Sequence, residues 1–216
     1  MKKATIILLI LLAMQTTRLA AQDFRTAMHT LQDRYATLNS LHLVMQLSKY
    51  DSASANPKYG ERIEIKKSGD NFHYHWGTCK MLLSEKSFLL VTDETKSIQY
   101  APRQIVVGTS APAVMNLDSL LAHTEIPEYI GRIDSIDHYR LKQDETVNVN
   151  LWISLRSKFI SKLEYDYKNG DRTTIDFVLF DADPLFEPTV FQESQYVIVE
   201  GKSIRPAPAY ANYSVH

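Results

Sequence analysis

Two periodicities of apolar residues divide the chain into a short helical part and a long series of strands. From residue 24 onward, apolar side chains recur at spacings of three and four, which is typical of one face of an α-helix. This face is formed by Phe24, Met28, Leu31, Tyr35 and Leu38. Asp23 stands just before it as a suitable N-cap, so we predict an amphipathic helix that begins here.

After residue 40 the period changes to two, which indicates strands with one apolar face. Turn sequences separate the strands, and Asn169-Gly170 is a strong hairpin signal. We count about nine or ten strands. Their apolar rows include Leu41, Leu43, Met45 and Leu47; Ile63 and Ile65; Phe72, Tyr74 and Trp76; Val147, Val149, Leu151 and Ile153; Leu163, Tyr165 and Tyr167; and Ile175, Phe177 and Leu179.

Only one further helix is predicted between these strands. Residues 101–113 contain Pro102 and Pro112 and are typical of a crossing loop. Asn116 can then cap a short helix over residues 117–123. No internal repeat and no linker divides the chain, so we expect residues 22–216 to form a single domain.

The first 21 residues have the pattern of a secretory signal peptide. Lys2 and Lys3 precede an apolar run over residues 4–14, and small residues around Ala21 offer a cleavage point. The run is about half the roughly 20 residues that a membrane-spanning helix needs. We therefore expect cleavage before Gln22 and a periplasmic location, with an uncleaved N-terminal anchor as the alternative.

The predicted sheet is too wide for its helices. A sheet with one apolar face must cover that face, and only the N-terminal helix and the short second helix are available. We therefore predict an α+β, mostly antiparallel fold in which the sheet curls into an incompletely closed barrel. Two helices leave either an apolar cavity suited to an acyl chain or a core filled by side chains, and the sequence leaves both open.

Composition and charge exclude several classes of function. The 24 basic and 25 acidic residues give no basic footprint for nucleic acid, and a chain without its first 21 residues would carry 21 basic and 25 acidic residues. Cys79 is the one cysteine, so no internal disulfide and no cysteine-rich zinc site can form. The 7 glycines form no phosphate-binding motif.

Few residues suggest catalytic or metal chemistry. His73 and His75 share a strand face at a spacing that can chelate a metal, but no third ligand stands nearby, and we expect them to face solvent. Asp181 and Asp183 could pair for acid–base work, although capping of the turn before Pro184 is the preferred interpretation. We predict a protein that is not an enzyme and that uses neither cofactor nor metal.

Three segments in this order resemble the LolA family of periplasmic lipoprotein carriers and the wider half-barrel superfamily that includes LolB and RseB. The first is the helix and strand entry LQDRYATLNSLHLVMQL of residues 31–47. The second is GERIEIKKSGDNFHYHW of residues 60–76, followed by SFLLVTDETKSIQYAPR of residues 87–103. The third is NLWISLRSKFISKLEYDYKNGDRTTIDFVLF of residues 150–180.

The resemblance implies a half-barrel lidded by helices that holds the acyl chains of a lipoprotein. It also implies partner proteins at the inner and outer membranes, and we expect a monomer that spans no membrane. Where the family has a lid-clamping arginine this chain has Lys67, which lacks the planar fork of arginine. The predicted ligand-binding residues are Phe24, Met28, Leu31, Tyr35, Ile63, Ile65, Lys67, Phe72, Tyr74 and Trp76.

A second hypothesis uses the same scaffold with a filled core. The protein would then be an interaction or sensing module of the cell envelope, as the RseB-like branch of the superfamily suggests. An exposed face or the tyrosine-bearing tail of residues 205–216 would bind the partner.

Overall fold

The computed structural model describes residues 24–35, 37–52, 54–103, 127–142 and 144–216. Residues 24–35 and residue 37 are α-helical, and no further α-helix occurs in these ranges. The strands are β1 (Ser40–Tyr50), β2 (Tyr59–Ser68), β3 (Asn71–Trp76), β4 (Cys79–Leu83), β5 (Ser87–Thr92), β6 (Ser97–Pro102), β7 (Glu128–Ile133), β8 (Ile136–Lys142), β9 (Val147–Ser154), β10 (Phe159–Tyr167), β11 (Arg172–Asp181), β12 (Val197–Glu200), β13 (Ser203–Pro206) and β14 (Ser214–Val215). Three short 3-10 helices lie near the C-terminus: η2 (Pro188–Phe191), η3 (Glu193–Gln195) and η4 (Pro208–Tyr210).

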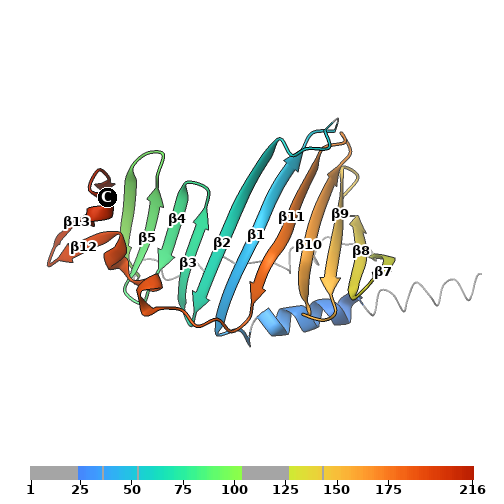
Figure 1. Ribbon diagram of the computed structural model, residues 1–216, viewed down its shortest axis with the longest axis horizontal. Coiled ribbons are helices and arrows are strands. Elements are labelled where there is room, and N and C mark those ends of the chain that lie inside the picture. The colour runs from blue at the N-terminus through green and yellow to red at the C-terminus, as the bar shows by residue number, and fades with distance from the viewer. Residues whose placement is uncertain (1–23, 36, 53, 104–126, 143) are drawn as a thin grey trace, which may run out of the picture. The chain divides into compact units, whose positions relative to one another are not determined.

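Hydrogen bonds order twelve strands as β14-β6-β5-β4-β3-β2-β1-β11-β10-β9-β8-β7, and β12 and β13 form a separate pair. Figure 1 labels all of these strands except β6 and β14. Neighbouring strands pair antiparallel from β2 to β6 and from β7 to β11, whereas β14 runs parallel to β6. Within the described residues β14 and β7 are the two ends of this strand order. The predicted class, a mostly antiparallel sheet with an N-terminal helix, is confirmed.

The sequence analysis did not predict the strands β7, β13 and β14. They are short, and prolines flank or occupy two of them, so no long alternating pattern marks them. The predicted signal peptide (residues 1–21) and second helix (residues 117–123) lie outside the described residues. Within those residues no helix is long and apolar enough to cross a bilayer.

Contacts divide the chain into two compact units. Of the described residues, the first unit comprises 24–35, 37, 48–52, 54–60, 127–142 and 144–176, and the second comprises 38–47, 61–103 and 177–216. The single domain over residues 22–216 remains a prediction.

In the first unit the N-terminal helix covers one face of β8, β9 and β10. The Phe24 ring meets the Tyr139 ring at 5.0 Å, and the Tyr35 ring meets the Phe159 ring at 5.2 Å, both edge-on. The strand side chains of this face, Leu141, Val149, Leu151 and Leu163, are at most 3% exposed. The spacing of three and four that predicted the helix therefore supplies the core of this unit.

In the second unit the C-terminal segment covers one face of β4, β5 and β6. Tyr196 and Val197 pack against Leu82, Leu89, Val91 and Ile98, and the four strand residues are at most 1% exposed. β14 extends the sheet beside β6, where the His216 amide donates to the Ile98 carbonyl at 2.9 Å. The tail of residues 205–216 thus helps to cover this face of the sheet.

Candidate functional site

The other face of the strands β2 to β6 in the second unit carries a continuous set of apolar side chains. Cross-strand register aligns three rows across the five strands. The rows are Ile63, Trp76, Cys79, Thr92 and Ser97; Ile65, Tyr74, Met81, Leu90 and Gln99; and Lys67, Phe72, Leu83, Phe88 and Ala101. We call this set the inner face. Neighbouring side chains on one sheet face lie close enough to present a single surface.

Exposure rises across the inner face toward one end of β3. Ile63, Ile65 and Phe72 are buried, with 4 to 9% of their surface exposed. Tyr74, Met81 and Leu90 are half-buried, and Trp76 is 44% exposed. A contiguous apolar surface of this kind is a feature of ligand and partner sites.

The structure brings together six of the ten residues predicted to bind a ligand. Ile63 pairs with Trp76, Ile65 with Tyr74, and Lys67 with Phe72 across β2 and β3. The other four are helix residues of the first unit. Of these, Phe24, Met28 and Leu31 are at most 1% exposed, and Tyr35 is half-buried.

Sequence reasoning did not place Met81, Leu83, Phe88 and Leu90 on this face. They come from β4 and β5, which are apolar on both sides, so their alternation cannot show which side chains point where. Register with β3 is the signal that assigns them, since Tyr74 stands opposite Met81 and Phe72 stands opposite Leu83.

Lys67 ends the inner face, and its charge is bonded to a backbone carbonyl at the border of that face. Its Nζ donates to the backbone carbonyl of Leu38 at 2.5 Å and lies 5.9 Å from the centre of the Phe72 ring. Two residues on, the Gly69 amide donates to the Asn39 carbonyl at 2.7 Å. Lys67 therefore fastens the β2–β3 turn to the segment that leads into β1, and its ammonium finds a partner there.

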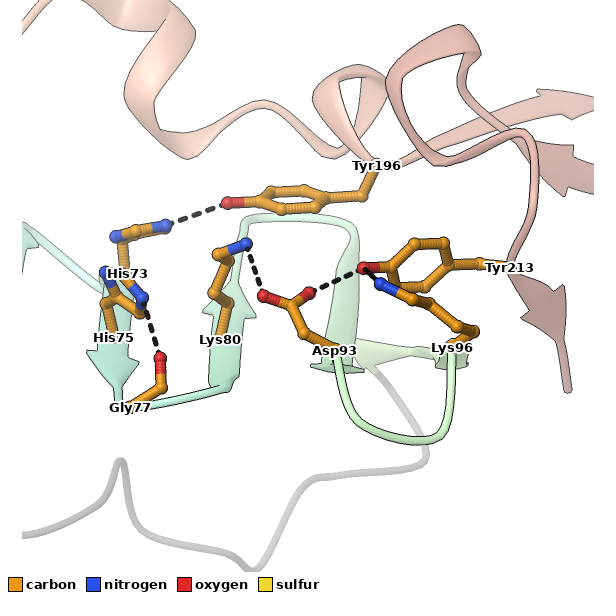
Figure 2. Close-up of polar contacts among 8 residues, drawn as sticks. All are labelled: His73, His75, Gly77, Lys80, Asp93, Lys96, Tyr196 and Tyr213. Atoms are coloured by element: carbon orange, nitrogen blue, oxygen red, sulfur yellow. Dashed lines mark hydrogen bonds and ion pairs between the residues drawn. The ribbon is translucent and has the colours of Figure 1, made fainter.

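The opposite face of the same strands is polar near β3, and the C-terminal segment binds it through hydrogen bonds (Figure 2). The Tyr196 hydroxyl and His73 Nε2 are 2.8 Å apart. Tyr213 donates to Asp93 Oδ1 at 2.8 Å, and Lys80 Nζ donates to Asp93 Oδ2 at 3.2 Å. These contacts fix the segment at two points of the sheet.

Burial and charge set the protonation states in this cluster. Burial, and after it the positive charge of Lys66, lowers the pKa of His73 to about 4. Burial, and after it Tyr210, raises the pKa of Tyr196 to about 12. Burial also acts to raise the pKa of Asp93, but hydrogen bonds from Tyr213 and Lys80 hold it below its usual value.

The expectation that His73 faces solvent is wrong. Its Nε2 is bonded beneath Tyr196, and its Nδ1 is buried, because the C-terminal segment covers this part of the sheet. His75 Nε2 instead lies 3.2 Å from the Gly77 carbonyl. Among the described residues, no group of three or more His, Cys, Asp or Glu side chains could hold a metal ion.

The other candidate residues from the sequence, the Asp181–Asp183 pair and the tail tyrosines, make contacts within the chain. The Asp183 amide donates to Asp181 Oδ1 at 3.2 Å, so this pair caps its turn, as the preferred interpretation held. Tyr210 packs against Tyr196 at 5.4 Å between ring centres. With Tyr213 bonded to Asp93, the tail tyrosines are engaged with the sheet of their own unit.

Comparisons with known proteins give structural likenesses only. No model of a known protein family matches the chain, and no curated protein matches it. An uncharacterised conserved protein from Thermus thermophilus is similar at a TM-score of 0.47 and 10% identity, over 76% of this chain and 92% of that one. LprF from Mycobacterium bovis has a TM-score of 0.42 and 14% identity, over 78% of this chain and 98% of that one.

A LolA superfamily protein from Nitrosomonas europaea is similar at a TM-score of 0.34 and 10% identity, over 78% of this chain and 97% of that one. At these scores and identities we draw no conclusion about function from the likenesses, and we infer the function from the residues of this chain.

Proposed function

We propose that this chain is a non-catalytic periplasmic binding protein that carries the acyl chains of lipoproteins or lipids. The observation that carries the proposal is the half-exposed apolar inner face of β2 to β6. Its members Tyr74, Met81, Leu90 and Trp76 keep apolar surface accessible while the opposite face of β4 to β6 is covered by the chain itself.

An acyl chain fits this face on energetic grounds. Each buried CH₂ group contributes about 0.8 kcal/mol, so even part of an acyl chain supplies several kcal/mol. Methionine and aromatic side chains such as Met81 and Trp76 adapt to a flexible ligand because they offer large, polarisable contact surfaces. Lys67, at the border of the face, has its ammonium bonded to the Leu38 carbonyl, and most residues of the three rows are apolar.

The proposed location and partners follow from the first 21 residues and the family resemblance. Cleavage before Gln22 would release the chain into the periplasm, where donor and acceptor proteins of a lipoprotein transfer pathway are the expected partners. The mass of the chain purified from the periplasmic fraction tests the cleavage, because removal of residues 1–21 gives a defined shorter product.

A fluorescent fatty acid tests the binding. We expect the purified chain to bind it and to release it to palmitate. Met81→Glu and Leu90→Glu place a carboxylate on the half-buried part of the inner face and should weaken binding at least tenfold. Val199→Glu is the matched control, since Val199 is 40% exposed on β12, outside the inner face.

Trp76 provides a second readout on the same face. In a Trp152→Phe variant Trp76 is the remaining tryptophan, so a brominated fatty acid should quench its fluorescence on binding. The proposal is overturned if neither fatty acid binds, or if Met81→Glu, Leu90→Glu and Val199→Glu bind equally well.

A further inference from the structure

A groove in the second unit lies apart from the inner-face rows and is rich in hydrogen-bond acceptors. It has a volume of about 640 Å³ and is lined by Ser68, Asn71, Ser84, Glu85, Lys86, Phe186, Glu187, Pro188, Phe191, Gln192, Glu193 and Ser194. A second pocket of about 540 Å³ shares Ser68, Asn71 and Glu85 with it and adds Asn39, Gly69, Asp70 and Arg103. None of the ten residues predicted to bind a ligand lines either one.

The walls of the groove are fixed by hydrogen bonds. Arg103 donates to the Ser84 carbonyl at 2.7 Å and to the Asp70 carbonyl at 3.3 Å, and so bridges the β2–β3 and β4–β5 turns. Ser87 is fully buried, and its hydroxyl donates to one oxygen of Glu193. The Glu193 carboxylate is therefore held in place at the edge of the groove.

The apolar part of the groove consists of two phenylalanines and a proline. The rings of Phe186 and Phe191 meet edge-on with their centres 5.5 Å apart, and Phe186 also contacts the His42 ring at 6.0 Å. Both phenylalanines are half-buried. Their accessible surfaces can take an aliphatic side chain or the stem and charge of a lysine or arginine.

The charge of the groove favours a cationic ligand. Across the two pockets the carboxylates of Asp70, Glu85, Glu187 and Glu193 outnumber the cations of Lys86 and Arg103, which leaves a formal charge of −2. The guanidinium of Arg103 is already engaged with backbone carbonyls. Charge complementarity of this kind selects partners and speeds their encounter.

Asn71 adds an acceptor that suits a polypeptide backbone. Its Oδ1 is buried, and among the described residues it has no hydrogen-bond donor. A buried acceptor without a donor costs free energy until one is supplied. An extended peptide supplies N–H donors at every second position toward one side, which a small inorganic cation does not.

We propose that this groove binds an extended polypeptide segment that alternates basic and apolar side chains. The basic side chains would contact Glu85, Glu187 and Glu193. An apolar side chain would lie on Phe186 and Phe191, and a backbone N–H would donate to Asn71 Oδ1 once this side-chain amide turns toward the groove. The proposal does not depend on acyl binding, because it uses neither the inner face nor its residues.

A fluorescein-labelled hexapeptide of alternating lysine and leucine tests the proposal by fluorescence anisotropy with the purified chain. We expect saturable binding that weakens roughly five- to tenfold in Glu85→Gln/Glu187→Gln. Binding should also weaken between about 0.01 M and 0.15 M salt, since the Debye length falls from about 30 Å to about 8 Å. Asn71→Ala should weaken binding further, while the thermal midpoint of each variant verifies folding.

Controls separate this groove from other sites. Glu94→Gln/Glu145→Gln removes two exposed carboxylates elsewhere and should leave binding unchanged. Met81→Glu/Leu90→Glu should abolish fatty-acid binding and leave peptide binding intact. Equal binding of a glutamate–leucine hexapeptide, full displacement by spermidine at equal charge concentration, or unchanged binding by Glu85→Gln/Glu187→Gln would each overturn the proposal.

Discussion

The two faces of one sheet in the second unit differ in how they are covered. On one face Leu82, Leu89, Val91 and Ile98 are at most 1% exposed beneath Tyr196 and its neighbours. On the inner face, residues adjacent in sequence to these, such as Met81 and Leu90, are half-buried. The same strands thus have a packed core on one face and accessible apolar surface on the other.

This difference separates stability from binding. The covered face gains its free energy from contacts within the chain, so its side chains are expected to matter for folding. The inner face keeps apolar surface that a ligand can bury, so its side chains are expected to matter for affinity. Substitutions at neighbouring positions of β5 test this division directly.

Leu89→Ala should have the largest effect on stability. Leu89 is fully buried under the C-terminal segment, so its truncation loses apolar contact and leaves a cavity, at a cost of about 2–5 kcal/mol in the free energy of unfolding. Leu90→Ala removes the same atoms from a half-buried site and should cost less than about 1.5 kcal/mol. Urea denaturation followed by circular dichroism measures both.

The comparison of Leu89→Ala with Leu90→Ala contains its own control. Equal losses of unfolding free energy would mean that both faces are packed as core, which would contradict the proposal that the inner face is a binding site. A larger loss for Leu89→Ala, together with weaker fatty-acid binding only for Leu90→Ala, is the result that the two faces predict.

His73 makes the attachment of the C-terminal segment sensitive to acid. Its pKa is about 4 in the folded chain because burial and the nearby Lys66 disfavour the charged form, against 6.5 for an unperturbed histidine. The unfolded chain therefore binds the proton more readily, so stability is lost as pH falls from about 6.5 toward 4. The part due to His73 should reach about 2–3 kcal/mol.

Several charged and titratable groups surround His73, so its contribution to the pH dependence of stability must be separated from theirs. Glu64, Lys66, His75 and Lys80 act on it from the strands, and Tyr196 bonds to it from the C-terminal segment. His73→Gln keeps a hydrogen-bonding side chain but removes the titration. The difference between the two pH–stability curves should be constant above pH 7 and change as pH falls from about 6.5 toward 4, and parallel curves from pH 7 to pH 4 would contradict the assignment.

The sequence predicted the parts of the fold that local patterns encode. Spacings of three and four placed Phe24, Met28 and Leu31 on the buried side of the helix, and alternation aligned Ile63 and Ile65 on one side of β2. It did not predict the cover over His73, because residues 182–216 contain short strands and prolines without a long period.

The groove lay beyond sequence reasoning for a different reason. Its walls come from residues 68–71, 84–86 and 186–194, which only the tertiary fold brings together. Asn71 begins β3 and Glu85 lies in the β4–β5 turn, and neither position carries a periodicity that would mark it as lining one space. Long-range register and loop placement are therefore what the structure adds.

Lys67→Met should have an intermediate effect and tests the border of the inner face. The substitution keeps an unbranched apolar stem but removes the charged hydrogen bond to the Leu38 carbonyl, at a cost of about 1–2 kcal/mol in unfolding free energy. Lys202→Met, at an exposed lysine of the β12–β13 turn, is the matched control in urea denaturation. Equal stability of the two variants would show that the Lys67 contact contributes nothing.

Tyr213→Phe should have the smallest effect and tests the second attachment point of the covered face. It removes the hydroxyl that donates to Asp93 at 2.8 Å, and we expect a loss of about 0.5–1.5 kcal/mol in unfolding free energy. Because that hydrogen bond helps to hold the pKa of Asp93 below its usual value, the pKa should rise in the variant.

The rise in the pKa of Asp93 separates a specific contact from simple loss of packing. A depressed carboxylate pKa stabilises the folded chain above the unfolded pKa, and this contribution disappears as pH falls through the folded pKa. Tyr213→Phe should therefore lose part of its stability deficit in acid, where Asp93 is protonated in both proteins.

Tyr167→Phe, at a tyrosine that is 39% exposed, is the control for this experiment. A deficit that stays constant down to pH 3, with no movement of the Asp93 carboxyl resonance in an NMR titration, would assign Tyr213 to packing alone.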